Sequence, residues 1–142
     1  MNDLKITKKQ LEKMGACPSG IEWFCEQKTT DTNILIKNII SSNNYSFANW
    51  YITKKLKKIA LVKYAIYAAE QVINIYTKKY PDDKRPQDAI QAAKNYIKNP
   101  NKNAANVAYA AANAASVAYA AEPDNIKTKI IKYGYKLLRS NK

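Results

Sequence analysis

One apolar stripe constrains the fold of this chain more than any other feature of its sequence. Between residues 59 and 76, apolar side chains recur at alternating steps of three and four residues. That spacing places them on one side of an α-helix, because the helix has 3.6 residues per turn. The pattern predicts a long helix that is capped by Thr53 and ends at Lys79, before Pro81. Its buried stripe consists of Ile59, Val62, Ile66, Ala69, Ile73 and Tyr76.

Further helix signals cover most of the remaining chain. Glycine and proline, with 3 and 5 copies in 142 residues, interrupt it rarely. Thr7 and Gln10 have capping-box spacing with Gly15 as a C-cap, and Asp31 or Thr32 can cap another helix. The predicted helices cover residues 7–14, 21–27, 33–40, 53–79, 86–99, 103–121 and about 124 to the C-terminus, the last with Ile126, Ile130, Tyr133 and Leu137 facing inward.

Residues 103–121 contain an internal repeat with a period of ten. The nine residues Asn-Ala-Ala-Asn-Val-Ala-Tyr-Ala-Ala return from residue 113 with one change. Ten residues fall about 80° short of three helical turns, so Tyr109 and Tyr119 spread over a broad face. The sequence therefore predicts an all-α protein: a single compact bundle of about six or seven helices, with one long central helix and one Ala-rich helix, forming one domain over residues 1–142.

The formal net charge of +13, from 24 basic and 11 acidic residues, limits the kinds of partner. Compositional drift toward Lys, Asn, Ile and Tyr is one explanation of the surplus. Selection for an anionic partner, meaning nucleic acid, a nucleotide or an acidic protein surface, is the other. The cations gather in two clusters, each of which is either a solvated face or an anion-binding surface. Lys54, Lys55, Lys57 and Lys58 are predicted to open the long helix, and Lys127, Lys129, Lys132, Lys136 and Arg139 lie on the last helix.

Several classes of chemistry lack their usual residues. The chain has no histidine and no glycine-rich phosphate loop, so we expect no catalytic residues and no enzyme activity. No metal site or cofactor is predicted. Asp82 or Asp83 is predicted to cap the helix that starts at Pro86, and a metal site at Asp82, Asp83 and Asp88 is the weaker alternative.

Cys17 and Cys25 are expected to be buried structural thiols, not a disulfide or a redox pair. No apolar segment suits a signal peptide or a membrane span, so a cytoplasmic location and no membrane partner are expected.

The aromatic residues near the two tryptophans allow two interpretations. Trp23 and Trp50, with Tyr51 beside the second, belong either to the core or to a surface on which a base stacks. In a helical bundle with many alanines, the core is the more ordinary place for such rings.

Two strings of the sequence resemble a known family. They are Ala65-Ile-Tyr-Ala-Ala-Glu-Gln-Val72 and Asp83-Lys-Arg-Pro-Gln-Asp-Ala-Ile-Gln-Ala-Ala93, preceded by Cys17, Trp23 and Trp50 and followed by the Ala-rich helix. The chain thereby resembles, over about residues 15–121, a family of small all-helical immunity protein-like proteins of phage and bacterial genomes. Its most specific element is Asp-x-Arg-Pro-x-x-Ala-Ile-x-Ala-Ala. The resemblance implies no reaction, and it suggests a phage counter-defence protein.

If this motif marks a pocket, Arg85 is the first candidate ligand-binding residue. It is one of only two arginines, and its planar guanidinium can bind two phosphate oxygens at once. The alternative is an ion pair with Asp83 or Asp88 that orients the helix start. The full set of candidate ligand-binding residues is Arg85, Lys84, Trp50, Tyr51, Lys54, Lys55, Trp23, Asn106, Tyr109 and Asn113.

Three functions follow from these observations. The leading one is a non-catalytic protein of phage-type counter-defence that sequesters an anionic nucleotide signal, a cyclic oligonucleotide or an ADP-ribose type. The first alternative is an immunity-like or inhibitor protein that binds an acidic protein partner. The second alternative is a basic helical protein that binds nucleic acid. We also expect a homo-oligomer, because the Ala-rich helix offers small side chains to a second copy.

Overall fold

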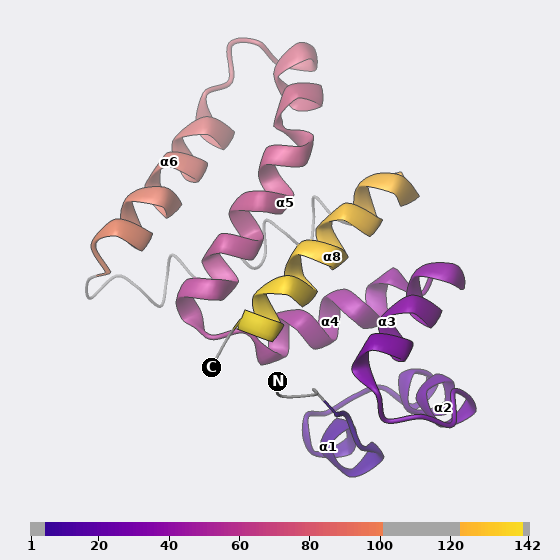
Figure 1. Cartoon of the computed structure of the whole chain (residues 1–142). Coiled ribbons are helices and arrows are strands. Elements are labelled where there is room, and N and C mark those ends of the chain that lie inside the picture. Colours follow the sequence, from indigo (N-terminus) through magenta and orange to yellow (C-terminus); the bar gives the residue numbers. More distant parts are fainter. Residues whose placement is uncertain (1–4, 101–122, 141–142) are drawn as a thin grey trace. The chain divides into compact units, whose positions relative to one another are not determined.

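The structure, a computed structural model, describes residues 5–100 and 123–140 (Figure 1). These residues form seven α-helices and no strand, apart from an isolated antiparallel bridge between Lys5 and Asp31. The predicted all-α fold class is confirmed, whereas the predicted Ala-rich helix over 103–121 lies outside the described residues. The helices are α1 (Lys8–Lys13), α2 (Pro18–Glu26), α3 (Thr32–Ser41), α4 (Tyr45–Lys55), α5 (Lys58–Lys79), α6 (Arg85–Lys98) and α8 (Asp124–Ser140).

Contacts within the chain divide it into two compact units, Met1–Lys54 and Lys55–Lys142. The single domain predicted over residues 1–142 stays a prediction. No helix in the described part of the chain is both long enough and apolar enough to cross a membrane.

The first unit forms its helix ends from local sequence signals. At the start of α1, the Thr7 hydroxyl accepts a hydrogen bond from the Gln10 amide at 3.2 Å, and the Gln10 side chain accepts one from the Thr7 amide at 2.9 Å. Gly15 follows the end of α1 with a φ of +83°, which a residue without Cβ adopts readily. Asp31 caps α3 by accepting a backbone hydrogen bond at 2.8 Å. These three signals were all predicted, and all three are confirmed.

The two cysteines differ from expectation. Both are free and exposed, so the prediction that they are buried is wrong. Cys17 is the N-cap of α2, outside the packed side of that helix, and its Sγ hydrogen-bonds Ser19 Oγ at 3.3 Å. This hydrogen bond lowers the pKa of the Cys17 thiol, with a smaller contribution from the Gly20 backbone. Cys25 lies eight residues on, about 12 Å along a helix, which is beyond the reach of a disulfide.

The break before the long helix lies further along the chain than predicted. Thr53 does not cap a helix: it lies inside α4, where its hydroxyl donates to the Trp50 carbonyl at 3.0 Å. The N-cap of α5 is Lys57, which has an extended backbone and makes no side-chain cap bond. Leu56, between the two helices, is buried. Because no glycine or proline marks this break, local helix signals could not place it.

This break changes the interpretation of the first lysine cluster. The prediction that all four lysines open the long helix is wrong. Lys54 and Lys55 belong to the last turn of α4, where the helix dipole favours cations. Only Lys57 and Lys58 stand at the start of α5.

In the second unit, the long helix α5 contacts both α6 and α8 (Figure 1). Val62 and Ile66 of α5 pack with Ala93 and Tyr96 of α6 in one buried cluster. Of the predicted stripe only Val62 and Ile66 are buried, both in contact with α6, so the prediction that Ile59, Ala69, Ile73 and Tyr76 are also buried is wrong. The buried positions of α5 that the stripe missed are Tyr64, Ala65 and Ala68. The contact between α5 and α8 includes Tyr67 and Tyr133, whose rings stack with centroids 4.2 Å apart and planes 15° from parallel.

The buried side of α8 is displaced from the predicted one. Ile130 is buried, as predicted, whereas Ile126, Tyr133 and Leu137 are only half-buried. The buried positions that the pattern missed are Ile131, Gly134 and Leu138.

Candidate binding surface at the α5–α6 turn

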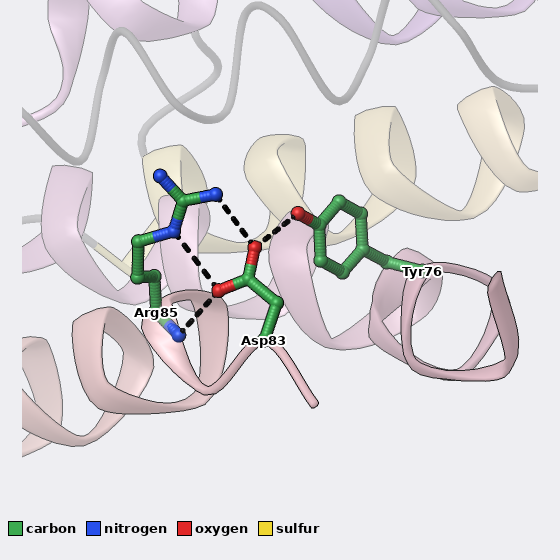
Figure 2. Close-up of polar contacts among 3 residues, drawn as sticks. All are labelled: Tyr76, Asp83 and Arg85. Atoms are coloured by element: carbon green, nitrogen blue, oxygen red, sulfur yellow. Dashed lines mark hydrogen bonds and ion pairs between the residues drawn. The ribbon is translucent and has the colours of Figure 1, made fainter. Parts of the chain in front are cut away.

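The turn between α5 and α6 is organised by one carboxylate (Figure 2). Asp83 Oδ2 accepts hydrogen bonds from the Tyr76 hydroxyl at 2.6 Å and from Arg85 Nη2 at 2.7 Å. Asp83 Oδ1 accepts from the backbone nitrogen of Arg85 at 3.0 Å and from its Nε at 2.9 Å. A single side chain thus joins the last turn of α5 to the start of α6 and holds the guanidinium by two parallel bonds.

The local sequence explains this arrangement. Helix α6 begins at Arg85, one residue earlier than predicted, with Pro86 in its first turn, where a missing N–H costs nothing. The N-cap of α6 is Lys84, which makes no side-chain cap bond, so the prediction that Asp82 or Asp83 is the cap is wrong. Asp83, the residue before this cap, accepts a hydrogen bond from the first N–H of the helix. Of the two alternatives for Arg85, the ion pair with Asp83 is present in the structure.

Burial and charge fix the protonation of the three residues. The Asp83 side chain is 18% exposed and the Arg85 side chain 88% exposed. The hydrogen bonds from Arg85, and then from Tyr76, hold the pKa of Asp83 far below its usual range. Donating to this carboxylate raises the pKa of Tyr76, and the same carboxylate raises the pKa of Arg85. Near neutral pH Asp83 is therefore ionised and Tyr76 keeps its proton.

Exposed aromatic and apolar side chains surround the network. Ile75 is 57% exposed and Tyr80 is 46% exposed. The Tyr80 ring lies 4.9 Å from the Tyr76 ring, and Lys79 Nζ lies 5.5 Å from the Tyr80 centroid. Tyrosine and arginine are the residue types that most often anchor protein interfaces, particularly when they are held in place before binding. Exposed and pre-positioned side chains of these types are features of a binding surface.

The structure places the other predicted site residues in different parts of the chain. Trp23, Trp50 and Tyr51 are half-buried and pack against the core of the first unit. Of the two alternatives for these rings, this is the packing against the core. The core residues beneath them are Ile6, Leu11, Phe24 and Leu35.

Of the predicted lysines, Lys54 and Lys55 are exposed at the end of α4, and Lys84 is exposed beside Arg85. Asn106, Tyr109 and Asn113 lie outside the described residues. That all of these residues belong to one site stays a prediction.

Sequence reasoning missed part of the turn. Tyr76 was assigned to the core stripe, and its bond to Asp83 depends on the closure of the α5–α6 hairpin. Gln87 was not singled out at all. Its Nε2 donates to Thr77 Oγ1 at 3.0 Å, while its Oε1 is buried without a hydrogen-bond partner among the described residues. A tyrosine in the last helical turn, followed by a short aspartate-bearing loop, is the signal that could have found the network.

The positive charge is unequally divided between the two units. Residues 55–142 carry 17 basic and 6 acidic residues, a net charge of +11. Residues 1–54 carry 7 basic and 5 acidic residues, a net charge of +2. Across residues 5–100 and 123–140, no group of three or more His, Cys, Asp or Glu side chains is placed to hold a metal ion.

Comparison with protein families identifies the second unit. A family model described as Imm-5 like putative immunity protein matches residues 52–130, more than half of the chain. The match includes α5, the α5–α6 turn and α6, and it confirms the resemblance to immunity protein-like proteins. Comparisons with curated proteins and with solved structures find no match. The chain therefore belongs to the Imm-5 like putative immunity protein family.

Proposed function

We propose that this protein is a non-catalytic, immunity-type protein that binds a protein partner with an acidic surface and inhibits it. The observation that carries the proposal is the charge of the second unit, residues 55–142, which is +11 from 17 basic and 6 acidic residues; the family model matches this unit up to residue 130. A surface of one sign attracts a partner of the other sign and raises the rate of association.

The α5–α6 turn supports a binding function rather than a catalytic one. Arg85 is exposed but fixed by Asp83, so its side chain loses little freedom when a partner binds. The ionisable groups beside it keep their protonation state around neutral pH. The chain also has no histidine to act as a base.

The test is to purify the tagged chain from the cells that naturally make it and to isolate any stoichiometric complex by size exclusion. A basic protein of similar net charge serves as the control. We expect one acidic protein to co-elute with the chain and not with the control. After release at high salt, that protein should regain an activity that falls again when the chain is added back. A chain that elutes alone, while binding a 20-base-pair DNA duplex with steep salt dependence, would establish a nucleic-acid-binding protein instead.

A second candidate function is the sequestration of an anionic nucleotide signal, as in phage counter-defence. One observation favours it: the guanidinium of Arg85 is 88% exposed, and Figure 2 shows its remaining terminal nitrogen directed away from Asp83. This nitrogen and the neighbouring, exposed Lys84 can bind phosphate oxygens. Because Asp83 binds Nε–H and one N–H of Nη2, a nucleotide has to bind beside the ion pair or displace it.

Thermal-shift measurements with cyclic dinucleotides, cyclic trinucleotides and ADP-ribose test this second function. A ligand at about 100 times its Kd adds about 2.7 kcal/mol of stability. The shift should disappear in Arg85→Ala and persist in the control Lys63→Ala, which removes an exposed cation of α5. Equal shifts in both variants would exclude Arg85 as the binding residue, and no shift with any nucleotide would exclude the function.

A further inference from the structure

Between Lys129 and Arg139, every exposed side chain of helix α8 is basic. Lys129, Lys132, Lys136 and Arg139 follow one another at steps of three, four and three residues, and all four are exposed. Those steps place the four side chains on one side of the helix, over about 15 Å of its length. The only acidic residue of α8 is Asp124, in its first turn. No carboxylate therefore lies within a helical turn of these cations along α8 itself.

These cations also lack ion pairs with the rest of the described chain. Elsewhere in the part of the chain that the structure describes, cations do find carboxylates: Lys94 Nζ lies 3.7 Å from Glu70, and Arg85 pairs with Asp83. Within residues 5–100 and 123–140, no salt bridge involves the three lysines or the arginine of the α8 face. The four cations of this face lie at helical spacing and repel one another, and a bound anionic partner would remove that repulsion.

The opposite side of α8 shows that this helix does not insert into a lipid surface. Ile130 and Ile131 are fully buried, as is Gly134, so α8 has no apolar face left for a bilayer. Helix α8 is also held against α5, because the Tyr133 ring stacks on the Tyr67 ring of α5. The basic face is consequently presented from a rigid support, which reduces the entropy lost on binding.

The rings of α8 argue against single-stranded nucleic acid as the partner. Proteins that bind it combine cations with aromatic rings on which bases stack. Tyr133 is already stacked on Tyr67, and the Tyr135 ring lies under the guanidinium of Arg139 at 5.8 Å. The remaining cations are lysines, which attract charge without selecting the planar geometry of a base. Carboxylates repeated at three- and four-residue steps on a partner helix match the spacing of this face.

We infer that the basic face of α8, formed by Lys129, Lys132, Lys136 and Arg139, is the surface that binds a glutamate- and aspartate-rich helix of the protein partner. The inference rests on the proposed function in one respect, namely that the partner is a protein. It adds the location of the interface and the chemistry of the segment that occupies it.

The experiment compares two triple variants that change the net charge equally. Lys129→Glu/Lys132→Glu/Lys136→Glu reverses the α8 face, and Lys63→Glu/Lys78→Glu/Lys98→Glu is the matched control with exposed lysines of α5 and α6. Circular dichroism and thermal melting establish that both variants fold. The probes are a fluorescent helical peptide with glutamates at i, i+3, i+4 and i+7 over four turns, and a 20-base-pair DNA duplex. Fluorescence anisotropy is measured from 50 to 200 mM salt.

The expected result is that the α8 variant loses at least tenfold in affinity for the peptide, while the control stays within threefold of the native chain. An equal loss in both variants would overturn the inference, because net charge alone would then explain the binding. Tighter binding of DNA than of peptide by the native chain, abolished in the α8 variant, would assign the face to nucleic acid. A partner protein recovered equally well by the native chain and by the α8 variant would leave the proposed function standing and place its interface elsewhere.

Discussion

Tyr64 provides a direct test of how the second unit is packed. It is the largest fully buried side chain of the described residues, and burial raises the pKa of its hydroxyl well above the ordinary value near 10. In the unfolded chain the hydroxyl loses its proton as the pH passes about 10, whereas in the folded chain it keeps the proton. The unfolded state is therefore favoured increasingly above that pH, and the free energy of unfolding falls.

The size of this effect follows from proton linkage. For a group that ionises only in the unfolded state, the loss is RT ln(1 + 10^(pH − 10)), which is about 0.1 kcal/mol at pH 9 and about 1.4 kcal/mol at pH 11. The Tyr64→Phe variant should lack this loss. Donation to Asp83 raises the pKa of Tyr76, and burial raises that of Tyr133, so these two act in the same direction. Both remain in the variant and cancel in the comparison.

The measurement is urea unfolding, followed by far-UV circular dichroism at pH 9, 10 and 11. Each protein is compared with itself across pH, so any constant cost of removing the hydroxyl cancels. The native chain should lose about 1.4 kcal/mol more than Tyr64→Phe between pH 9 and pH 11. Tyr80→Phe, which removes the same atom from an exposed ring, is the control and should follow the native chain. Identical pH dependence in the native chain and in Tyr64→Phe would refute the burial argument.

Three further predictions concern other parts of the chain. Ile130→Ala should lower the free energy of unfolding by about 2–5 kcal/mol in urea, because this fully buried side chain leaves a cavity; a loss below about 1 kcal/mol would contradict the packing of α8. The Asp83→Asn variant should have a lower melting temperature than the native chain at neutral pH, and this difference in melting temperature should narrow between pH 5 and pH 2. The reason is that a carboxyl group with a depressed pKa stabilises the fold only while it is ionised. A difference in melting temperature that stays constant with pH would count against the network. Cys17 should react with iodoacetamide faster than Cys25 at pH 7.5, because the hydrogen bond with Ser19 lowers the pKa of the Cys17 thiol. The single-thiol variants Cys25→Ser and Cys17→Ser give the rates of Cys17 and Cys25, respectively. Equal rates would exclude an effect of this hydrogen bond on reactivity.

Local sequence signals were sufficient to predict those features of the fold that depend on a few neighbouring residues. The capping box at Thr7, the positive φ of Gly15 and the cap at Asp31 are each formed within one helical turn. The long helix α5 was also predictable, because its period is a property of one helix, although only Val62 and Ile66 of the predicted stripe are buried. By contrast, the break before α5 has no glycine or proline, and only the burial of Leu56 distinguishes it.

The candidate site depends on contacts that the sequence could not rank. Arg85 has three acidic neighbours within three residues, and the sequence could not choose between an ion pair and a free guanidinium. The choice of Asp83 is linked to Tyr76, seven residues earlier, which reaches the carboxylate only when the hairpin has closed. Trp23 and Trp50 were similarly open to two interpretations, because hydrophobic pattern alone does not separate a core ring from an exposed one.

The network at Asp83 also has a consequence for how the family can vary. Its carboxylate reaches back to Tyr76 and forward to the first residue of α6, so the number of residues between those two points is fixed by bond lengths. An insertion of one residue there would move the carboxylate away from one of its two partners and break the link between α5 and α6. We therefore expect relatives to keep the length of this connection constant while exchanging freely the exposed residues at its outer edge, Pro81 and Asp82.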